Sequence, residues 1–389
     1  MTRLGVIGYG HRIAAMIKHC FRVVDPDLRV VAVVDPDEAG ARSRMEEDDR
    51  ADATFYPDLR SLVRKAKPDA LAIGTRCNLH APYAIKAAAF DIPLFLEKPV
   101  ANSPAQAVAL ERAFLKSNCP VVVSFPLRVS PLCALARTYI EEGAVGSPEH
   151  ILGVNYVPYG VGYFDHAYRD FSITQGRFLQ KATHDFDYMA YLMGAPIVRV
   201  SAMASRGRVF KGKKPAGMRC SRCRDAETCL ESPANRRRNA SGGDPNDHLC
   251  TFGRDIGSPE TGMNEDSSSA LLEFATGAQG VYTQVFYSRR DAAARGSTVS
   301  GYTGTLTFDW YKNEMRRIRH HQPFSDIIKP AEGMSHFGGD MELAHEFVNR
   351  IKGKGPARIS IWDGIRSVYA CLAAKESAET GKFVKVRQI

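Results

Sequence analysis

A pair of glycines, Gly8 and Gly10, lies between a short apolar strand and an amphipathic helix near the N-terminus. Residues 3–8 are predicted to form the buried strand, and residues 11–24 place apolar side chains at helical spacing. Here Gly8 would permit a tight turn, and Gly10 would let the backbone approach a bound group. The free N–H groups at the start of a helix favour phosphate. The turn therefore predicts a site that binds the pyrophosphate of a dinucleotide.

Ile13 occupies the position of the third glycine in the pattern G-x-G-x-x-G. That glycine mainly allows the helix to pack closely on the strand, and it does not contact phosphate. We expect Ala14 and Ala15 to supply the small volume instead, with Ile13 shifting the helix outward. The side chains or backbone of the remaining turn residues are also expected at the cofactor site, namely Tyr9, His11 and Arg12.

A second predicted strand, residues 28–34, ends in Asp35, about 25 residues after Gly10. This is close to the spacing of the acid that binds the adenosine ribose in dinucleotide-binding domains. Asp35 would accept hydrogen bonds from both ribose hydroxyl groups and would repel a 2′-phosphate. Asp37 follows where an NADP enzyme often carries a basic residue, so the sequence predicts NAD as the cofactor.

The chain of 389 residues is too long for one ordinary core and predicts two domains. Up to residue 125, strands alternate with helices, which predicts an α/β Rossmann domain with a doubly wound parallel sheet. Its later strands are expected at 69–74, 92–96 and 121–124. Residues 126–389 are expected to form an α+β domain with an open, mostly antiparallel sheet, and a cysteine-containing insert at about 206–265. Its strands are expected at 151–156, 199–204, 269–274, 279–286 and 304–310.

Composition excludes several classes of protein. The net charge of +9 includes the runs Arg236 to Arg238 and Arg316 to Arg317. These runs lie in loop-like sequence without interleaved aromatic residues, so we expect a solvated face or attraction for anionic substrates, and no nucleic acid. Apolar runs end well before the roughly 18 residues of a membrane span. No secretory signal is visible, and nine cysteines without a regular framework fit a reducing compartment. The expected location is cytoplasmic, with no membrane partner.

Further polar stretches follow strands of the predicted parallel sheet, where ligands bind in such folds. With them the chain resembles the Gfo/Idh/MocA family (glucose-fructose oxidoreductase, inositol dehydrogenase and relatives) over nearly its whole length. The matching stretches are residues 8–10, 75–80, Glu97-Lys98-Pro99, 139–146, and His184-Asp-Phe-Asp187 before 192–194. The resemblance implies an NAD-dependent oxidoreductase, and it adds Thr75, Asn78, His80, Glu97 and Lys98 to the expected cofactor site.

In the family, the residues that match Lys98 and His184 lie beside the nicotinamide and the reacting carbinol, so the resemblance implies catalytic roles for both. Oxidation of an alcohol requires a base for the hydroxyl proton while hydride leaves carbon. His184 is the competing or cooperating base, and the alternative is a histidine of the helix core. Asp187, three residues on, would share the helix face of His184 and could orient the imidazole or bind sugar hydroxyl groups.

The family often has Asp-x-Gly-x-His before this helix, whereas this chain has Gln180-Lys-Ala-Thr-His184. This form resembles a subgroup with Lys-x-x-His-Asp-x-Asp, in which Lys181 would bind substrate or share proton transfer. Tyr168 and Arg169 also resemble that subgroup. Arg169 would hold a sugar hydroxyl or an anionic group, or would form a surface salt bridge. Arg128 is a further expected substrate-binding residue.

The insert contains Cys220, Cys223 and Cys229 at C-x₂-C-x₅-C spacing, followed by Cys250. Four thiols can converge on one tetrahedral ion, and an arginine-rich insert without an obvious core would gain stability from a structural zinc. His248 could replace Cys250, and free cytosolic cysteines are the alternative. Cysteines at these places also resemble the same subgroup.

The residues support two functions that differ in class. The first is an NAD-dependent oxidoreductase acting on a hydroxyl-bearing carbon of a sugar, cyclitol or glycoside. The alternative is an NAD-dependent glycosidase, in which transient oxidation, elimination, hydration and re-reduction give net hydrolysis. A binding or sensor protein would lack the catalytic pair, yet Lys98 and His184 are both present. In the family the outer face of the second sheet usually forms the oligomer interface, which implies a homodimer or homotetramer.

Overall fold

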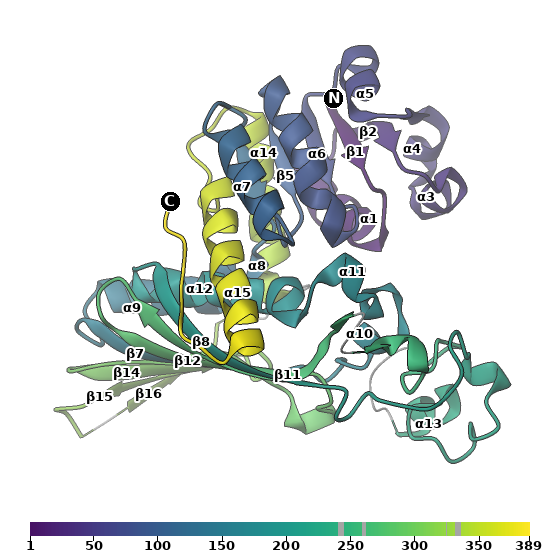
Figure 1. Cartoon of the computed structure of the whole chain (residues 1–389). Coiled ribbons are helices and arrows are strands. Elements are labelled where there is room, and N and C mark those ends of the chain that lie inside the picture. The colour runs from purple at the N-terminus through teal and green to yellow at the C-terminus, as the bar shows by residue number, and fades with distance from the viewer. Residues whose placement is uncertain (240–244, 259–261, 324, 331–335) are drawn as a thin grey trace. The chain divides into compact units, whose positions relative to one another are not determined.

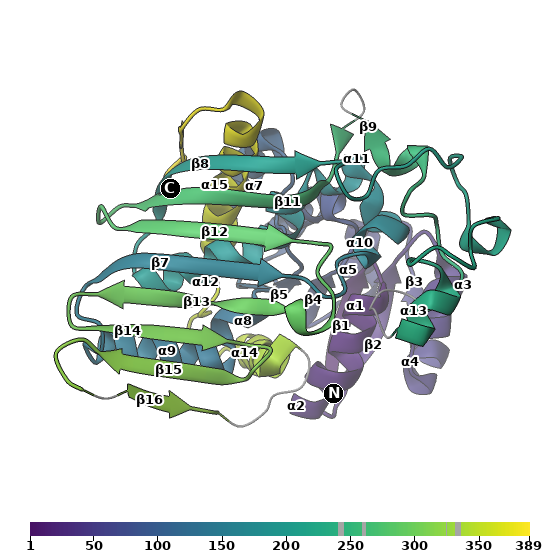
Figure 2. The same cartoon turned by 90° about the horizontal axis from the view of Figure 1, so that it is seen from below.

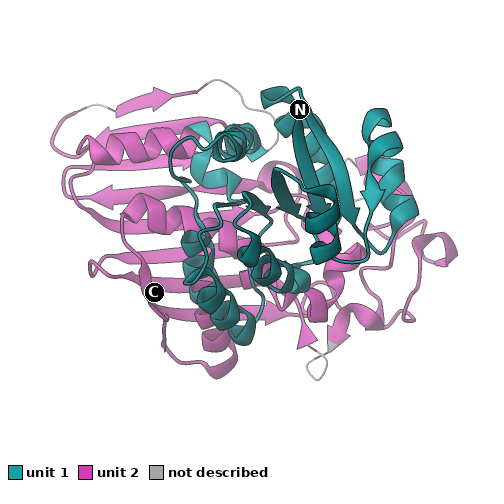
Figure 3. Cartoon of the chain, turned by 90° about the horizontal axis from the view of Figure 1, so that it is seen from above, with its two compact units in different colours: residues 1–131, 332–369, 389 teal, residues 132–331, 370–388 magenta. Residues whose placement is uncertain are grey.

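The computed structural model describes residues 1–239, 245–258, 262–323, 325–330 and 336–389. Figure 3 shows its two compact units: unit 1 contains residues 1–131, 332–369 and 389, and unit 2 contains residues 132–331 and 370–388. The first boundary lies close to the expected break after residue 125, but unit 1 also includes the later segment 332–369. Residues 240–244 and 259–261 of the expected insert lie outside the described residues.

Unit 1 contains a parallel sheet with the strand order β3-β2-β1-β4-β5-β6. The strands are β1 (Thr2–Ile7), β2 (Leu28–Val34), β3 (Thr54–Phe55), β4 (Ala70–Ile73), β5 (Leu94–Leu96) and β6 (Val121–Val123). Every residue of β4, β5 and β6 is buried, as expected of a sheet with both faces covered. The order reverses between β1 and β4, so a ligand crevice is expected beyond the carboxyl ends of these two strands.

Helices of unit 1 lie between these strands in the sequence, and α8 and α14 follow the last strand; Figure 1 labels several of them. They are α1 (His11–Met16), α2 (Arg22–Val24), α3 (Glu38–Arg44), α4 (Glu47–Asp52), α5 (Leu59–Ala66), α6 (His80–Ala87), α7 (Pro104–Phe114), α8 (Pro126–Val129) and α14 (Gly339–Ile351). A π-helical segment, Ile17–Phe21, joins α1 to α2, so the predicted helix over 11–24 is present. The rings of Phe21, Phe95 and Phe347 pack with centroids 5.1–5.6 Å apart. This aromatic contact fixes α14 to unit 1 although it comes late in the sequence.

Unit 2 contains a nine-stranded sheet with the order β16-β15-β14-β13-β7-β12-β11-β8-β17 (Figure 2). Its strands are β7 (Pro148–Tyr156), β8 (Ile197–Arg206), β11 (Glu265–Phe274), β12 (Gln279–Val285), β13 (Ala294–Gly301), β14 (Gly304–Asp309), β15 (Glu314–Arg319), β16 (Ser325–Ile328) and β17 (Val384–Lys385). β7 and β12 pair in parallel, and the other pairs are antiparallel. The predicted fold class, a Rossmann domain followed by a mostly antiparallel sheet domain, is confirmed.

The helices of unit 2 include α12, which packs on β7. They are α9 (Pro131–Glu141), α10 (Gly162–Asp165), α11 (Phe171–Thr174), α12 (Thr183–Met193), α13 (Pro233–Asn239) and the second half of α15 (Ile361–Thr380). The first residue of α9 belongs to unit 1. Two short strands, β9 (Gly257–Ser258) and β10 (Gly262–Met263), pair with each other. Buried and exposed residues alternate along β11 and β12, as they do in sheets covered on one face.

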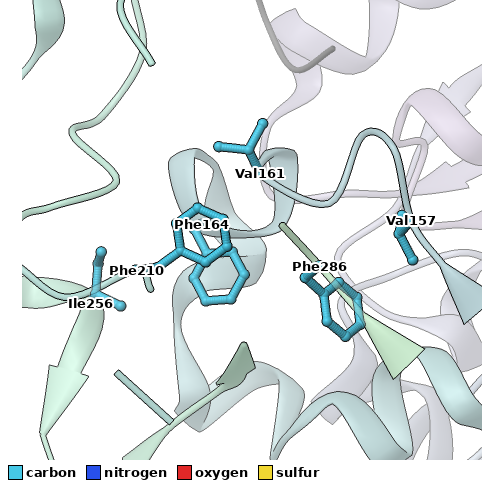
Figure 4. Close-up of a cluster of buried hydrophobic side chains, with 6 residues drawn as sticks. All are labelled: Val157, Val161, Phe164, Phe210, Ile256 and Phe286. Atoms are coloured by element: carbon cyan, nitrogen blue, oxygen red, sulfur yellow. The ribbon is translucent and has the colours of Figure 1, made fainter. Parts of the chain in front are cut away.

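A cluster of buried apolar side chains gives the insert a core, contrary to the sequence expectation (Figure 4). Phe210 and Ile256 of the insert pack with Val157, Val161, Phe164 and Phe286. The rings of Phe164 and Phe210 are stacked, with centroids 4.1 Å apart. The insert is therefore held by apolar contact with the segment that follows β7, which sequence spacing alone did not reveal.

The two arginine runs lie in secondary structure and not in loops. Arg236, in α13, is 2% exposed and donates to Asp165 at 2.5 Å and to Glu231 at 3.1 Å. Arg316 and Arg317 lie in β15, where Arg317 pairs with Asp326 at 2.5 Å. The expectation of loops is therefore wrong at these positions, and Arg236 is buried, whereas Arg237, Arg238 and Arg316 are exposed, as expected of a solvated face. Among the described residues, no helix is long and apolar enough to cross a membrane.

Candidate active site

The glycine turn lies where β1 ends and α1 begins. Gly8 has φ +80°, and a Cβ atom there would lie 2.7 Å from the backbone of Thr75, so no other residue fits without strain. Gly10 is the N-cap residue of α1 and leaves the first turn without a side-chain cap. His11 is exposed, whereas the Tyr9 side chain is buried, and burial raises its pKa to about 12. Tyr9 therefore faces the turn with its backbone.

Ile13 is fully buried, and the room for it comes from Gly74 at the end of β4. A Cβ atom at Gly74 would lie 1.9 Å from Cγ1 of Ile13. Ala15 is exposed and Ala14 is half-buried, so they do not supply the space as expected from the sequence. Gly74, which directly follows β4, therefore provides the space that the third glycine of the pattern would otherwise provide.

The close contact between Ile13 and Gly74 predicts that substitutions at these two positions affect stability in a coupled way. Gly74→Ala should lower the free energy of unfolding by about 1–3 kcal/mol through overpacking, and Ile13→Ala by about 2–5 kcal/mol through the cavity it leaves. The double variant should lose less than the sum, because the new methyl group fills part of that cavity. Urea unfolding of the three variants measures this, and strictly additive losses would contradict the contact.

Asp35 directly follows β2 and fixes the turn. Its Oδ2 accepts from the backbone N–H of Tyr9 at 2.7 Å, and its Oδ1 accepts from that of Asp37 at 2.9 Å. Nε of Arg44 donates to the carbonyl oxygen of Tyr9 at 2.9 Å. Each carboxylate oxygen can accept a further hydrogen bond. Asp35 can therefore hold the turn and still receive the hydroxyl groups of a ribose.

Arg12 is the centre of a polar network inside unit 1. Its guanidinium binds both carboxylate oxygens of Asp340 at 2.7 Å, Glu97 at 2.9 Å and the hydroxyl of Ser124 at 3.3 Å. Ser124 also donates to Glu97 at 3.0 Å. Burial opposes the charge, but the two carboxylates outweigh it and raise the pKa of Arg12 above its ordinary value. Arg12 thereby holds Glu97, the residue before Lys98.

His80 connects two strand ends in unit 1. Its Nδ1 lies 2.9 Å from the carbonyl oxygen of Pro99, and its Nε2 lies 2.9 Å from that of Thr75. Burial lowers the pKa of His80. His80 thus ties the end of β4 to the loop after β5. Near it, Oδ1 of Asn78 is buried without a hydrogen-bond partner in the described structure.

These features fit a bound dinucleotide. The side-chain-free Gly10, the uncapped first turn of α1 and the acid after β2 match what a pyrophosphate and a ribose require. The buried acceptor of Asn78 would gain a donor from a ligand at this edge. Lys98, half-buried in the loop after β5, lies at the same carboxyl edge of the sheet.

Arg128 is engaged within unit 1. Its Nη1 lies 3.1 Å from Asp363 and 3.4 Å from the carbonyl oxygen of Arg358. Burial opposes ionisation of Asp363, yet Arg128 outweighs it, and the pKa of that carboxyl is lowered. These contacts anchor the start of α15, and the expected role of Arg128 in substrate binding stays a prediction.

The substrate half of the predicted site lies in unit 2. His184 is in the first turn of α12 and is 5% exposed, and Asp187 on the same helix is 3% exposed. Lys181 precedes them in a π-helical segment, Phe178–Ala182, that runs directly into α12. Such π-segments are frequent at functional sites. Lys98 belongs to unit 1, so its pairing with His184 stays a prediction.

Asp185 was not predicted as a site residue. Its buried carboxylate accepts hydrogen bonds from a cluster of buried polar side chains. Its carboxylate binds Arg295 at 2.9 and 3.0 Å, the hydroxyl of Tyr282 at 2.9 Å and the amide of Asn155 at 3.0 Å. Burial opposes the charge of Arg295, but Asp185 outweighs it and raises the pKa of the guanidinium. The cluster anchors α12 to the sheet strands β7, β12 and β13 beside His184.

Lys181 has two tyrosine partners that the sequence did not single out either. Nζ of Lys181, on a side chain buried to 4% exposure, donates to the hydroxyl groups of Tyr159 at 3.0 Å and Tyr163 at 3.2 Å. The four tyrosines between residues 156 and 168 were the available signal. Tyr168 is 41% exposed, and its ring packs on that of Tyr163 with centroids 5.9 Å apart.

Arg169 is buried and forms an ion pair, although not the surface pair considered from the sequence. Its Nη2 donates to Asp255 of the insert at 2.8 Å. Nε and Nη1 are buried without hydrogen-bond partners among the described residues, and burial lowers the pKa of the guanidinium. Two donors of Arg169 are therefore available for a ligand or for water.

The four cysteines of the insert line one cavity of about 550 Å³. The zinc prediction is nevertheless not supported, because within the described ranges no group of three or more His, Cys, Asp or Glu side chains is arranged to hold a metal ion. Burial raises the pKa of Cys220 to about 12, and that of Cys250 is also raised. Both ring nitrogens of His248 lie within 3.0 Å of backbone carbonyl oxygens, and 3.7 Å from Sγ of Cys220.

The chain thus has two parts, a Rossmann sheet with a glycine turn and an acid after its second strand, and the mixed sheet that follows. Residues 2–125 match the family model "Oxidoreductase family, NAD-binding Rossmann fold". Residues 165–386 match "Oxidoreductase family, C-terminal alpha/beta domain". The chain belongs to the Gfo/Idh/MocA family, as its motifs predicted.

Named relatives include dehydrogenases of sugars and cyclitols. Levoglucosan dehydrogenase of Pseudarthrobacter phenanthrenivorans is 31% identical over 145 residues, which cover 36% of this chain and 36% of that protein. Myo-inositol 2-dehydrogenase of Thermotoga maritima is 26% identical over 203 residues, covering 52% and 58%. The matches span 36% to 63% of the length of the first curated relatives.

Solved structures show the same fold over the whole chain. Levoglucosan dehydrogenase in complex with NADH and levoglucosan aligns with a TM-score of 0.77 at 20% identity and covers 100% of both chains. An oxidoreductase domain protein from Kribbella flavida aligns with a TM-score of 0.76 at 18% identity, also over 100% of both chains. At this identity the likeness extends to the fold alone.

Proposed function

We propose that this protein is an NAD-dependent oxidoreductase that transfers hydride between the cofactor and a hydroxyl-bearing carbon of a sugar or cyclitol. The observation that carries the proposal is the carboxyl edge of the unit 1 sheet, where the Gly8 turn, Asp35 and Lys98 follow β1, β2 and β5. NAD would supply the hydride acceptor at this edge. The names of two relatives, levoglucosan dehydrogenase and myo-inositol 2-dehydrogenase, support the substrate class.

In this reaction the chain's own residues bind the cofactor, hold the loop that carries Lys98, transfer a proton and bind the substrate. Asp35 binds the ribose and fixes the turn, and Arg12 holds Glu97 so that the loop carrying Lys98 keeps its position. Lys98 and His184 are the proposed acid–base groups for the hydroxyl proton. Tyr168, Arg169 and Asp187 in unit 2 are the proposed substrate-binding residues. A homodimer or homotetramer and a cytoplasmic location stay predictions.

The glycosidase alternative uses the same residues, with Lys181 as an additional base, and ends without net reduction of the cofactor. The test is to incubate the protein with NAD⁺ and a panel of sugars, cyclitols and aryl glycosides while following NADH absorbance and aglycone release together. Stoichiometric NADH with no aglycone supports the dehydrogenase. Aglycone release without accumulated NADH supports the glycosidase, and neither signal on any compound contradicts both.

Asp35→Ala should weaken NAD binding by about 10- to 10²-fold, because hydrogen bonds to a charged acceptor contribute roughly 1.5–3 kcal/mol. Asp35→Arg should let NADP compete, since it would no longer repel the 2′-phosphate. Calorimetric titration with both cofactors measures the affinities. Asp58→Ala is the matched control, because Asp58 is an N-cap residue too and accepts from the N–H of Ser61 at the start of α5. Equal NAD affinity in wild type and Asp35→Ala would refute the assignment.

A further inference from the structure

The buried ammonium of Lys181 is paired with tyrosines instead of a carboxylate. Its hydrogen bonds go to Tyr159 and Tyr163, and Nζ lies 5.1 and 5.6 Å from the centroids of their rings. In the part of the chain that the structure describes, no carboxylate forms an ion pair with this ammonium. A buried charge usually has an ionised partner, because desolvation is costly otherwise. The partner available to Lys181 is a tyrosine hydroxyl group.

The electrostatics of the cluster favour an ionised tyrosine. Burial alone would lower the pKa of Lys181, but the attraction of the ionised forms of Tyr159 and Tyr163 outweighs it and raises that pKa above its ordinary value. Such an attraction acts equally on both partners. The ammonium of Lys181 is therefore placed to stabilise negative charge on the phenol oxygen of Tyr159, which is the shorter of its two contacts.

Within the described ranges, the other charged groups around the cluster supply no counterion to Lys181. Arg295, on β13, faces Lys181 and tends to lower its pKa, but the charge of Arg295 is balanced by Asp185. Tyr311, which follows β14, has its pKa raised to about 12 by burial and by Tyr159.

Tyr159 and Tyr163 differ in access. Tyr159 is 43% exposed, whereas the Tyr163 ring packs edge-on against the buried Phe286 with centroids 5.5 Å apart. Tyr159 is therefore the more accessible of the two tyrosines. Lys181 also lies one helical turn before His184, the histidine proposed for proton transfer.

We propose that Tyr159 is a proton acceptor for the substrate hydroxyl group, with Lys181 as the positioning residue that stabilises its phenolate form. The inference rests on the proposed function and deepens it. In the step, the phenolate oxygen of Tyr159 forms an O–H bond with the hydroxyl proton. The substrate C–H bond breaks, its hydrogen and electron pair pass to NAD⁺, and the carbon–oxygen single bond becomes a carbonyl. Carbonyl reduction runs through the same bonds in reverse.

The first test reads the ionisation of Tyr159 without any enzyme activity. Protein labelled with ¹³C at the phenol carbon of tyrosine is titrated by NMR, and Tyr159→Phe assigns the resonance. We expect Tyr159 to ionise at least about one pH unit below Tyr302, an exposed reference, because a cation lies beside it. Lys181→Met should abolish this difference, and Lys181→Arg should preserve it. Titration of Tyr159 together with Tyr302 in the wild type would overturn the proposal.

The second test uses the sugar or cyclitol that gives most NADH in the substrate panel. Tyr159→Phe should lower kcat by at least about 10²-fold and remove the ionisation from the pH profile of kcat, while NAD affinity stays unchanged. Tyr302→Phe is the matched control and should keep wild-type kcat. Lys181→Arg should retain more activity than Lys181→Met, because it keeps the charge beside Tyr159.

The outcomes separate the two proposals. If the wild type forms NADH and Tyr159→Phe keeps the wild-type kcat and pH profile, the role of Tyr159 is wrong and the dehydrogenase assignment stands. If the wild type forms no NADH from any compound, the dehydrogenase assignment fails, and the role of Tyr159 in that reaction fails with it. If Lys181→Met does not fold, the Lys181→Arg and Tyr159→Phe variants still decide the question through the NMR and kcat readouts.

Discussion

Lys98→Ala is expected to lower turnover by about 10²–10⁴-fold, roughly 3–5 kcal/mol of barrier, while cofactor binding stays nearly intact. Lys98 follows β5 in a loop whose neighbours are fixed by Arg12 and His80. Because these contacts do not involve the Lys98 side chain, its removal should leave the loop in place. Steady-state kinetics on the active compound and NAD titration of the same preparation measure the two effects.

Lys98→Arg decides which property of the lysine matters. Arginine keeps the positive charge but cannot deprotonate, so it cannot serve as a base. Activity close to that of Lys98→Ala would make Lys98 the base or a proton relay. Substantial recovery would assign it an electrostatic role and leave proton transfer to His184 or Tyr159. Wild-type turnover in Lys98→Ala would refute any catalytic role, and Lys181 with His184 would be the next pair to test.

The double variant Lys98→Ala/His184→Ala tests cooperation between the two proposed acid–base groups. If they share one proton path, removal of either breaks it, and the double change should cost less than the sum of the single changes. Fully additive losses would show that they act independently. This readout does not depend on how the two compact units are arranged.

Local patterns made the structure at the carboxyl edge of the unit 1 sheet predictable. The turn at Gly8, the strand ending at Asp35 and the loop at Lys98 depend on short segments, in which turn chemistry and strand periodicity decide the structure. The compensation for Ile13 was not predictable in this way. It depends on Gly74, about sixty residues later, and on the parallel pairing of β1 with β4.

The substrate half was less predictable because its contacts are long-range. Helical spacing from His184 drew attention to Asp187, whereas Asp185 is bound by Arg295 from β13. The sequence of β13, ARGSTVSG, contains two glycines and only one large apolar residue, so no strand was expected there. The zinc expectation relied on cysteine spacing, on a resemblance and on the lack of an obvious core in the insert. None of these could show that Phe210 and Ile256 give the insert an apolar core.

Removal of Arg295 is expected to be among the most destabilising single changes in unit 2. Arg295→Met leaves the carboxylate of Asp185 fully buried, with Tyr282 and Asn155 as its remaining donors among the residues that the structure describes. Breaking a buried ion pair by removing one partner costs about 3–5 kcal/mol, because the remaining charge stays desolvated. The free energy of unfolding from urea titration should fall by this amount. Arg199→Met is the matched control, since its pair with Glu273 is exposed and should contribute less than about 1 kcal/mol.

The double variant Arg295→Met/Asp185→Asn removes both charges and keeps an acceptor for the hydroxyl of Tyr282. It should therefore be more stable than Arg295→Met alone, because no uncompensated charge remains in the core. If instead the double variant is less stable than either single variant, the cluster contributes through its hydrogen bonds rather than through charge balance. If Arg295→Met lowers the free energy of unfolding by less than about 1 kcal/mol, water reaches Asp185 in solution. In that case α12, with His184 in its first turn, is less firmly fixed than the buried cluster implies.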